Sequence, residues 1–116
     1  MEIISHRGNL YGPEPTIENT VKALQVALHK GFSIEFDLWY HEGEYWLGHD
    51  KPQKKILPWK IHEWVEEYPK AMLYCHCKDI VTLQRFVYVH YKHLKNQCIP
   101  FFHDIDECIL LANGNL

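Results

Sequence analysis

Short segments that alternate apolar and polar residues recur along this chain of 116 residues. The clearest is residues 33–38, in which apolar side chains at every second position separate Ser33, Glu35 and Asp37. A period of two is typical of a β-strand, whose successive side chains point to opposite faces. The pattern therefore predicts a strand with one apolar face and with Glu35 and Asp37 together on the other.

Further strands and helices follow in alternation. Strands are predicted at residues 2–5, 71–77 and 99–102, and helices with one apolar face at residues 17–30, 59–68 and 79–95. Thr16 is the predicted N-cap of the first helix and Gly31 its end, whereas residues 50–55 are polar and predict a loop. No repeat or linker divides this order, so we expect a single α/β domain over residues 1–116.

A hairpin is predicted directly after the strand that carries the two carboxylates. Glu42 and Gly43 have turn character, because glycine accepts the positive φ of tight hairpin corners. Asp37 and His49 are each six residues from Gly43, so the returning chain is expected to bring His49 level with Asp37. His6 ends the first strand and is expected to approach the same point from a neighbouring strand.

Two carboxylates on one strand face repel each other unless they share a proton or bind a cation. Carboxylate oxygens are the ligands that Mg²⁺ and Ca²⁺ prefer, so Glu35 and Asp37 predict a site for one of these ions. The alternative is a polar strand that faces water, with both carboxylates merely solvated.

Four short motifs bear a resemblance to a known family. They are His6-Arg7-Gly8, Glu18-Asn19-Thr20, Glu35-Phe36-Asp37 and His49-Asp50, in the family's order and at its approximate spacings. With these residues the chain resembles the glycerophosphodiester phosphodiesterase family and, more distantly, sphingomyelinase D and phosphatidylinositol-specific phospholipase C. A looser similarity continues through residues 73–78 and 100–104.

The resemblance implies a TIM-type (β/α)₈ barrel that hydrolyses phosphodiesters and has a role in lipid metabolism. It implies that His6 and His49 act as general acid and base, in an order that the sequence does not fix. Arg7 is the expected phosphate ligand, because a guanidinium holds phosphate oxygens in a bidentate fork. Lys78 is a second candidate for binding the substrate.

The resemblance also implies a divalent metal, Mg²⁺ or Ca²⁺, bound by Glu35, Asp37 and a third group. Where the family places a third acidic ligand, this chain has His76, followed by Cys77 and Lys78. A softer, neutral ligand would then replace a carboxylate. A second departure is length, because a complete barrel needs about 250 residues. We therefore expect only the N-terminal half to two-thirds of a barrel, whose open sheet edges promote a homo-oligomer.

Cysteines and further acidic groups offer alternatives in the second half of the chain. The four cysteines are Cys75, Cys77, Cys98 and Cys108. Cys75, Cys77 and His76, together with Cys98 or His103, make a small zinc-binding domain an alternative. The paired spacings of structural zinc modules are absent, and buried free thiols are the simpler interpretation. His103, Asp104 and Asp106 follow the last predicted strand and are secondary candidates for the site.

Composition narrows the classes of function. The chain is 47% hydrophobic and 23% charged, with a net charge of −3 and a pI near 6.3. A nucleic acid or an anionic membrane is not the expected partner, because such partners favour a basic surface. No apolar stretch is long enough for membrane insertion, and no secretory signal begins the chain. We expect a cytoplasmic hydrolase of a small phosphodiester, or else an inactive remnant that serves as a binding or structural module.

Overall fold

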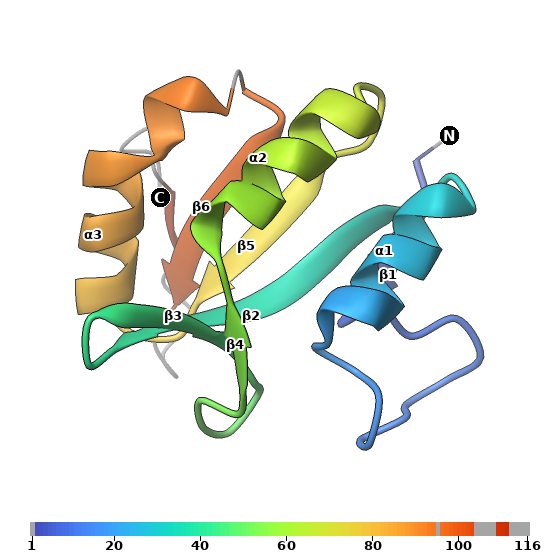
Figure 1. Ribbon diagram of the computed structural model, residues 1–116, viewed down its shortest axis with the longest axis horizontal. Coiled ribbons are helices and arrows are strands. Elements are labelled where there is room, and N and C mark those ends of the chain that lie inside the picture. The colour runs from blue at the N-terminus through green and yellow to red at the C-terminus, as the bar shows by residue number, and fades with distance from the viewer. Residues whose placement is uncertain (1, 95, 104–108, 112–116) are drawn as a thin grey trace.

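The computed structural model describes residues 2–94, 96–103 and 109–111. They form one mixed β-sheet with three α-helices on one of its sides (Figure 1). The strands are β1 (Ile4–His6), β2 (Ser33–His41), β3 (Glu44–Leu47), β4 (Lys54–Ile56), β5 (Leu73–Cys77), β6 (Cys98–His103) and β7 (Ile109–Leu111). The helices are α1 (Val21–His29), α2 (Pro58–Glu67), α3 (Ile80–Val89) and the short 3₁₀ helix η1 (Tyr91–His93).

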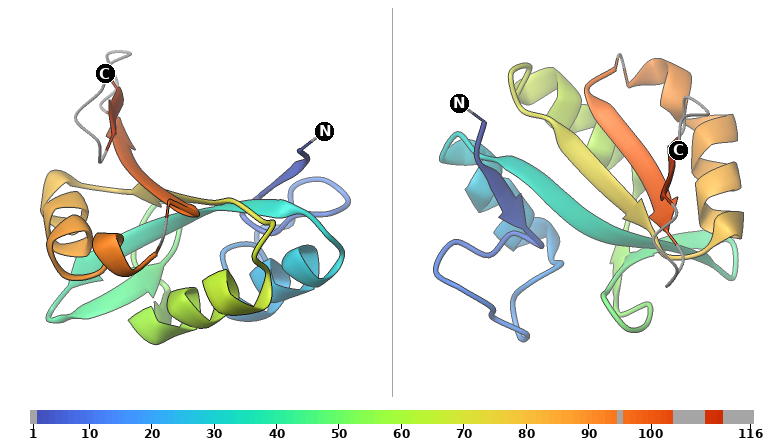
Figure 2. Two further views of the ribbon diagram at one scale, coloured as in Figure 1. Left: turned by 90° about the horizontal axis from the view of Figure 1, so that it is seen from above. Right: turned by 180° about the vertical axis from the view of Figure 1, so that it is seen from behind.

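Four strands of the sheet are parallel, and β1, which pairs only with β2, lies outside the main strand order β4-β3-β2-β5-β6-β7. β1 pairs with β2, β2 with β5, and β5 with β6, and a helix lies between each pair of these strands along the chain. The helices lie on the same side of the sheet, and none of them covers its opposite face (Figure 2). The parallel register places Asp37 of β2 directly beside His76 of β5.

The other strands are antiparallel to their neighbours. β2 and β3 form a hairpin whose two turn residues, Glu42 and Gly43, have φ of 53° and 80°. Positive φ at both positions is the type I′ geometry, which matches the twist of the flanking strands. The hairpin continues into β4, and at the other end of the sheet β7 pairs with β6.

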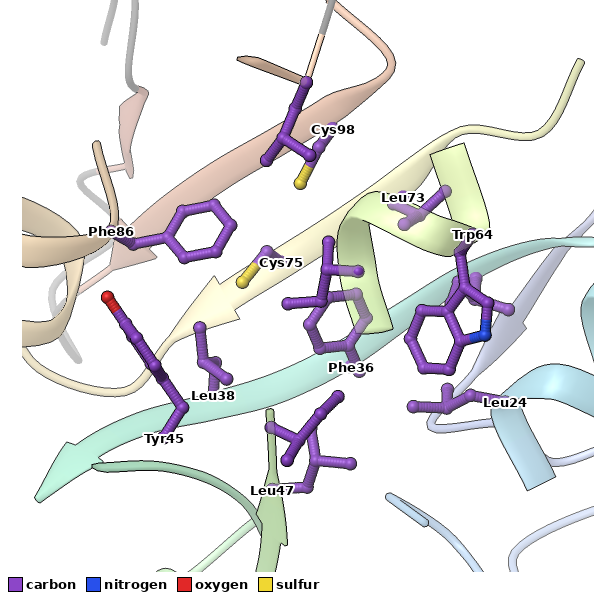
Figure 3. Close-up of a cluster of buried hydrophobic side chains, with 14 of the residues drawn as sticks. Leu24, Phe36, Leu38, Tyr45, Leu47, Trp64, Leu73, Cys75, Phe86 and Cys98 are labelled. Carbon is purple, nitrogen blue, oxygen red and sulfur yellow. The ribbon is translucent and has the colours of Figure 1, made fainter. Parts of the chain in front are cut away.

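The core lies between the sheet and the helices (Figure 3). Apolar residues at alternate positions of β2 pack there, and Phe36 meets Trp64 of α2 edge to face, with ring centroids 6.3 Å apart. The fully buried large side chains include Trp64, Phe36, Phe86, Leu24, Leu28, Ile34, Leu38, Leu47, Ile61, Leu73 and Leu94. The polar side of β2, with Glu35 and Asp37, therefore faces away from the helices.

The prediction of a TIM-type barrel is wrong. Over the residues that the structure describes the sheet is open, because its edges are β1, β4 and β7 and no pairing joins them to one another. A barrel closes eight parallel strands inside a ring of helices, whereas the described residues provide four parallel strands and three α-helices. The alternation of strand and helix in the sequence is common to open sheets and barrels, so it does not predict closure.

Most of the predicted elements are present with shifted bounds. The predicted loop at residues 50–55 is partly wrong, because it runs into strand β4. Lys54 and Lys55 of this strand are exposed and only Ile56 is buried, so no apolar alternation indicates it. No helix in the described part of the chain is long and apolar enough to span a membrane.

Candidate functional site

Asp37 is the centre of a cluster of polar side chains at the ends of the parallel strands. Its side chain is almost fully buried. The Nδ2 amide of Asn19 donates to Oδ2 of Asp37 at 2.9 Å, and Nδ1 of His76 lies 2.9 Å from Oδ1. A buried carboxylate with a hydrogen bond at each oxygen is held in one orientation.

The neighbours of Asp37 favour the ionised form of its carboxylate. Burial alone would raise the pKa, but the hydrogen bonds from His76 and Asn19 and the charge of Lys78 outweigh burial and lower the pKa from 3.8 to about 2. An ionised carboxylate only accepts hydrogen bonds. His76 therefore carries its proton on Nδ1 and donates it to Asp37.

Arg7 connects Asp37 to the loop that follows β1. Its Nε lies 3.2 Å from Oδ2 of Asp37, and its Nη1 lies 3.3 Å from Oε1 of Glu18. The arginine side chain is 19% exposed, and its backbone has a φ of 58°. The next residue, Gly8, has a φ of 81°, and a Cβ there would lie 2.9 Å from the backbone of Ala23 in α1. Glycine thus lets the loop pack on the helix and fixes the position of Arg7.

His49 follows the β2–β3 hairpin and contacts both Arg7 and Asp37. Nη2 of Arg7 lies 2.7 Å from Nδ1 of His49 and 3.2 Å from its Nε2. Because a guanidinium only donates, His49 accepts this bond as a neutral imidazole. Nδ1 of His49 also lies 3.6 Å from Oδ2 of Asp37, so a protonated His49 has an acceptor within a short movement.

His49 is not the residue directly opposite Asp37, as its spacing from Gly43 predicts, but the residue after it. The centre of the turn lies between Glu42 and Gly43, so the residue opposite Asp37 is Gly48, whose N–H donates to the carbonyl of Asp37 at 3.3 Å. Gly48 leaves no room for a side chain, because a Cβ would lie 2.0 Å from the carbonyl oxygen of Lys51. The imidazole still lies beside the carboxylate.

Lys78 and His76 come from the end of β5. The backbone N–H of Lys78 donates to Leu38 at 2.9 Å, and its Nζ lies 3.8 Å from Oδ1 of Asp37. The ring of His76 is stacked on Phe101 of β6, with centroids 5.0 Å apart and an angle of 4° between the planes. The cluster thus contains Arg7, Lys78, His49 and His76 around one carboxylate.

His6 and Glu35 form a second contact on the same side of the sheet. Nε2 of His6 lies 3.2 Å from Oε1 of Glu35, and the His6 side chain is 57% exposed. Residue 6 is the register partner of residue 35, and the N–H of the next residue, Arg7, donates to the carbonyl of Glu35 at 2.7 Å. Both predicted catalytic histidines therefore lie beside a carboxylate of β2, His6 beside Glu35 and His49 beside Asp37.

Asn19 is the residue of the cluster whose role the sequence did not indicate. Its amide accepts from the N–H of Asp37 at 2.9 Å and donates to the carboxylate of the same residue. Its own N–H donates to the carbonyl of Arg7 at 2.8 Å, in a backbone conformation with a φ of 54°. Asn19 therefore holds the loop after β1 against β2. The only signal for it was its place in the second family-like motif.

The surroundings of Asp37 do not fit the predicted metal site. Both carboxylate oxygens already accept hydrogen bonds, and two cationic groups lie within 4 Å of them. A divalent ion on Asp37 would have to displace these donors and approach Arg7 and Lys78 against their charge. Glu35 is engaged with His6 instead. In the described ranges no group of three or more His, Cys, Asp and Glu side chains is arranged to hold a metal ion.

The alternative zinc ligands are not arranged for metal binding either. Cys75, Cys77 and Cys98 are free and buried. All three belong to the core on the helix side of the sheet. Burial raises the pKa of Cys75 and of Cys98, which disfavours the thiolate form that binds zinc. Cys108, Asp104 and Asp106 and the side chain of His103 lie outside the described residues.

A groove of about 520 Å³ lies beside the loop after β1 and α1. Gly8, Leu10, Tyr11, Ile17 and Val26 are among the residues that line it, and none of the cluster's charged residues does. The groove is therefore separate from the polar cluster around Asp37.

Comparisons with family models, curated proteins and solved structures find no match to this chain.

Proposed function

We propose that the chain is a phosphodiester hydrolase that acts on small glycerophosphodiester-like substrates. The observation that carries the proposal is the convergence of Arg7, Lys78 and His49 on the buried carboxylate of Asp37. A guanidinium and an ammonium are the protein groups that bind phosphate oxygens best. A histidine next to them is the usual group for proton transfer near neutral pH.

The two histidines have different surroundings, which suggest different roles. His6 is exposed and its Nε2 faces Glu35. We assign it as the base, because the carboxylate stabilises the imidazolium that forms when Nδ1 takes a proton. The proton comes from water or from a neighbouring hydroxyl of the substrate, whose oxygen then forms the new P–O bond.

His49 is assigned as the acid. A phosphate bound to Arg7 competes with His49 for the guanidinium, and the released imidazole can then hold a proton beside Oδ2 of Asp37, 3.6 Å away. His49 gives that proton to the leaving alcohol as the old P–O bond breaks. The proton taken by His6 and the proton given by His49 balance, and no step passes through a metal.

Asp37 and Asn19 orient these groups. Asp37 holds Arg7 and His76 in position, and Asn19 holds Asp37. Preorganised donors of this kind stabilise the charge that develops on phosphate oxygens.

Hydrolysis of a glycerophosphodiester such as glycerophosphocholine, followed by ³¹P NMR, tests the proposal. We expect turnover by the wild type and its loss in His6→Ala and in His49→Ala. His41→Ala is the matched control, because His41 is an exposed histidine at the hairpin. Turnover that is unchanged in His49→Ala, or a folded wild-type chain without turnover, would contradict the proposal.

The runner-up is a phosphate-binding module without catalysis. The bond between Arg7 and His49 favours it, because it occupies the imidazole that would have to hold the transferred proton. Binding of the phosphodiester without turnover is the result that would select it.

A further inference from the structure

The charge balance at Asp37 differs from that of a divalent-metal site. Arg7 and Lys78 each bring one positive charge within 4 Å of the carboxylate, and Glu18 is the second carboxylate in contact with Arg7. Asp37 is almost fully buried, whereas Mg²⁺ and Ca²⁺ sites keep carboxylate oxygens open to the ion. Side-chain cations therefore contact the carboxylate of Asp37 where a metal ion would otherwise do so.

Lys78 has the geometry of a ligand-binding cation. Its side chain is only 16% exposed, and its nearest carboxylate oxygen is 3.8 Å away, beyond the usual hydrogen-bond distance. Among the described residues no hydrogen bond from its Nζ is found. An ammonium in a confined position therefore keeps its N–H groups for an incoming acceptor, and phosphate oxygens are strong acceptors.

Arg7 has donors in reserve as well. Its Nε is buried and makes no hydrogen bond, although Oδ2 of Asp37 lies 3.2 Å away. Its Nη2 is bonded to the neutral imidazole of His49, which is a weaker partner than an anion. A phosphate would replace this partner with a charged one.

We propose that Arg7 and Lys78 neutralise the bound phosphate in place of a divalent cation, so that the site works without Mg²⁺ or Ca²⁺. This inference rests on the proposed function and departs from the metal that the resemblance implies. Asp37 then serves as a counter-ion that holds both cations in position, and it is not a metal ligand.

Binding of inorganic phosphate to the whole chain, measured by calorimetry in EDTA and again in Mg²⁺ or Ca²⁺, tests the inference. We expect equal affinity under all these conditions. Lys78→Met should weaken binding by about tenfold or more, because it removes one of two charge-assisted partners. Lys78→Arg should retain most of the affinity. Lys92→Met is the control, because Lys92 is an exposed lysine in η1.

Phosphate binding that requires the metal, that is unchanged in Lys78→Met, or that is absent under every condition would overturn the inference. The hydrolysis assay separates its failure from that of the proposed function. Turnover that EDTA abolishes and Mg²⁺ or Ca²⁺ restores would uphold the hydrolase and overturn metal independence. Phosphate binding that needs no metal and depends on Lys78, without turnover, would uphold metal independence and overturn the hydrolase.

Discussion

Removing the charge of Asp37 should change the pH dependence of stability in a defined range. The folded-state pKa of Asp37 is about 2, compared with 3.8 for the ordinary carboxyl. Because the folded-state pKa is lowered, the ionised carboxylate stabilises the fold above the ordinary pKa, and this contribution is lost as the pH falls through the folded-state pKa. The full contribution is about 2 kcal/mol, from about 1.4 kcal/mol per pKa unit.

The expected loss can be worked out at an accessible pH. Between pH 6 and pH 3, the difference between the two pKa values predicts a loss of about 1 kcal/mol in the free energy of unfolding of the wild type. In Asp37→Asn this titration is absent. We therefore predict that the stability advantage of the wild type over Asp37→Asn shrinks by about 1 kcal/mol over this range, because other carboxyl groups cancel in the comparison.

Urea unfolding at a series of pH values between 3 and 6 measures this difference. Asp50→Asn is the control, because Asp50 is also near His49 but its side chain is 92% exposed, and its profile should run parallel to that of the wild type. If the wild type and Asp37→Asn instead lose stability in parallel down to pH 3, the buried carboxylate is not held ionised by its neighbours and the description of the site is wrong.

Gly48→Ala should destabilise the chain by about 2 kcal/mol or more, because a Cβ would lie 2.0 Å from the carbonyl oxygen of Lys51; urea unfolding measures the loss, and a neutral effect would mean that the loop is not tightly closed. Burial, and then the charges of neighbouring histidines, lower the pKa of His62 and of His90, whose ring nitrogens lie 3.1 Å apart. The unfolded chain therefore binds more protons than the folded chain, and the free energy of unfolding should fall as the pH drops below 6.5. The double variant His62→Gln, His90→Gln should lack this fall. If its stability depends on pH as that of the wild type does, these two histidines do not cause the fall. Association through the open sheet edges stays a prediction, which sedimentation tests, and a monomer at high concentration would exclude it.

Local patterns in the sequence predicted the parts of the site that depend on local structure. The alternation in residues 33–38 is that of β2, and it correctly placed Glu35 and Asp37 on the side opposite the core. The glycine at the turn correctly predicted the hairpin that returns His49 to Asp37. The error of one residue arose because a two-residue turn has its centre between Glu42 and Gly43.

Pairing between distant strands produced what local patterns did not predict. The hydrogen bond between His76 and Asp37 depends on the register of β2 and β5, and periodicity does not encode register between strands that are joined through a helix. Asn19 reaches Asp37 only because the loop after β1 folds back over β2. The barrel prediction failed for the same reason, because closure is a property of the whole set of strands.

Backbone NMR of the isotopically labelled chain during titration with glycerophosphocholine in EDTA tests whether the phosphodiester binds at Asp37. We expect amide shifts to concentrate at Arg7, Gly8, His49 and Lys78, which belong to three separate segments that meet at Asp37. Lys92 serves as the internal reference, because it lies in η1, away from the cluster. Shifts that are absent, or that concentrate on the groove beside α1, would contradict a phosphodiester site at Asp37.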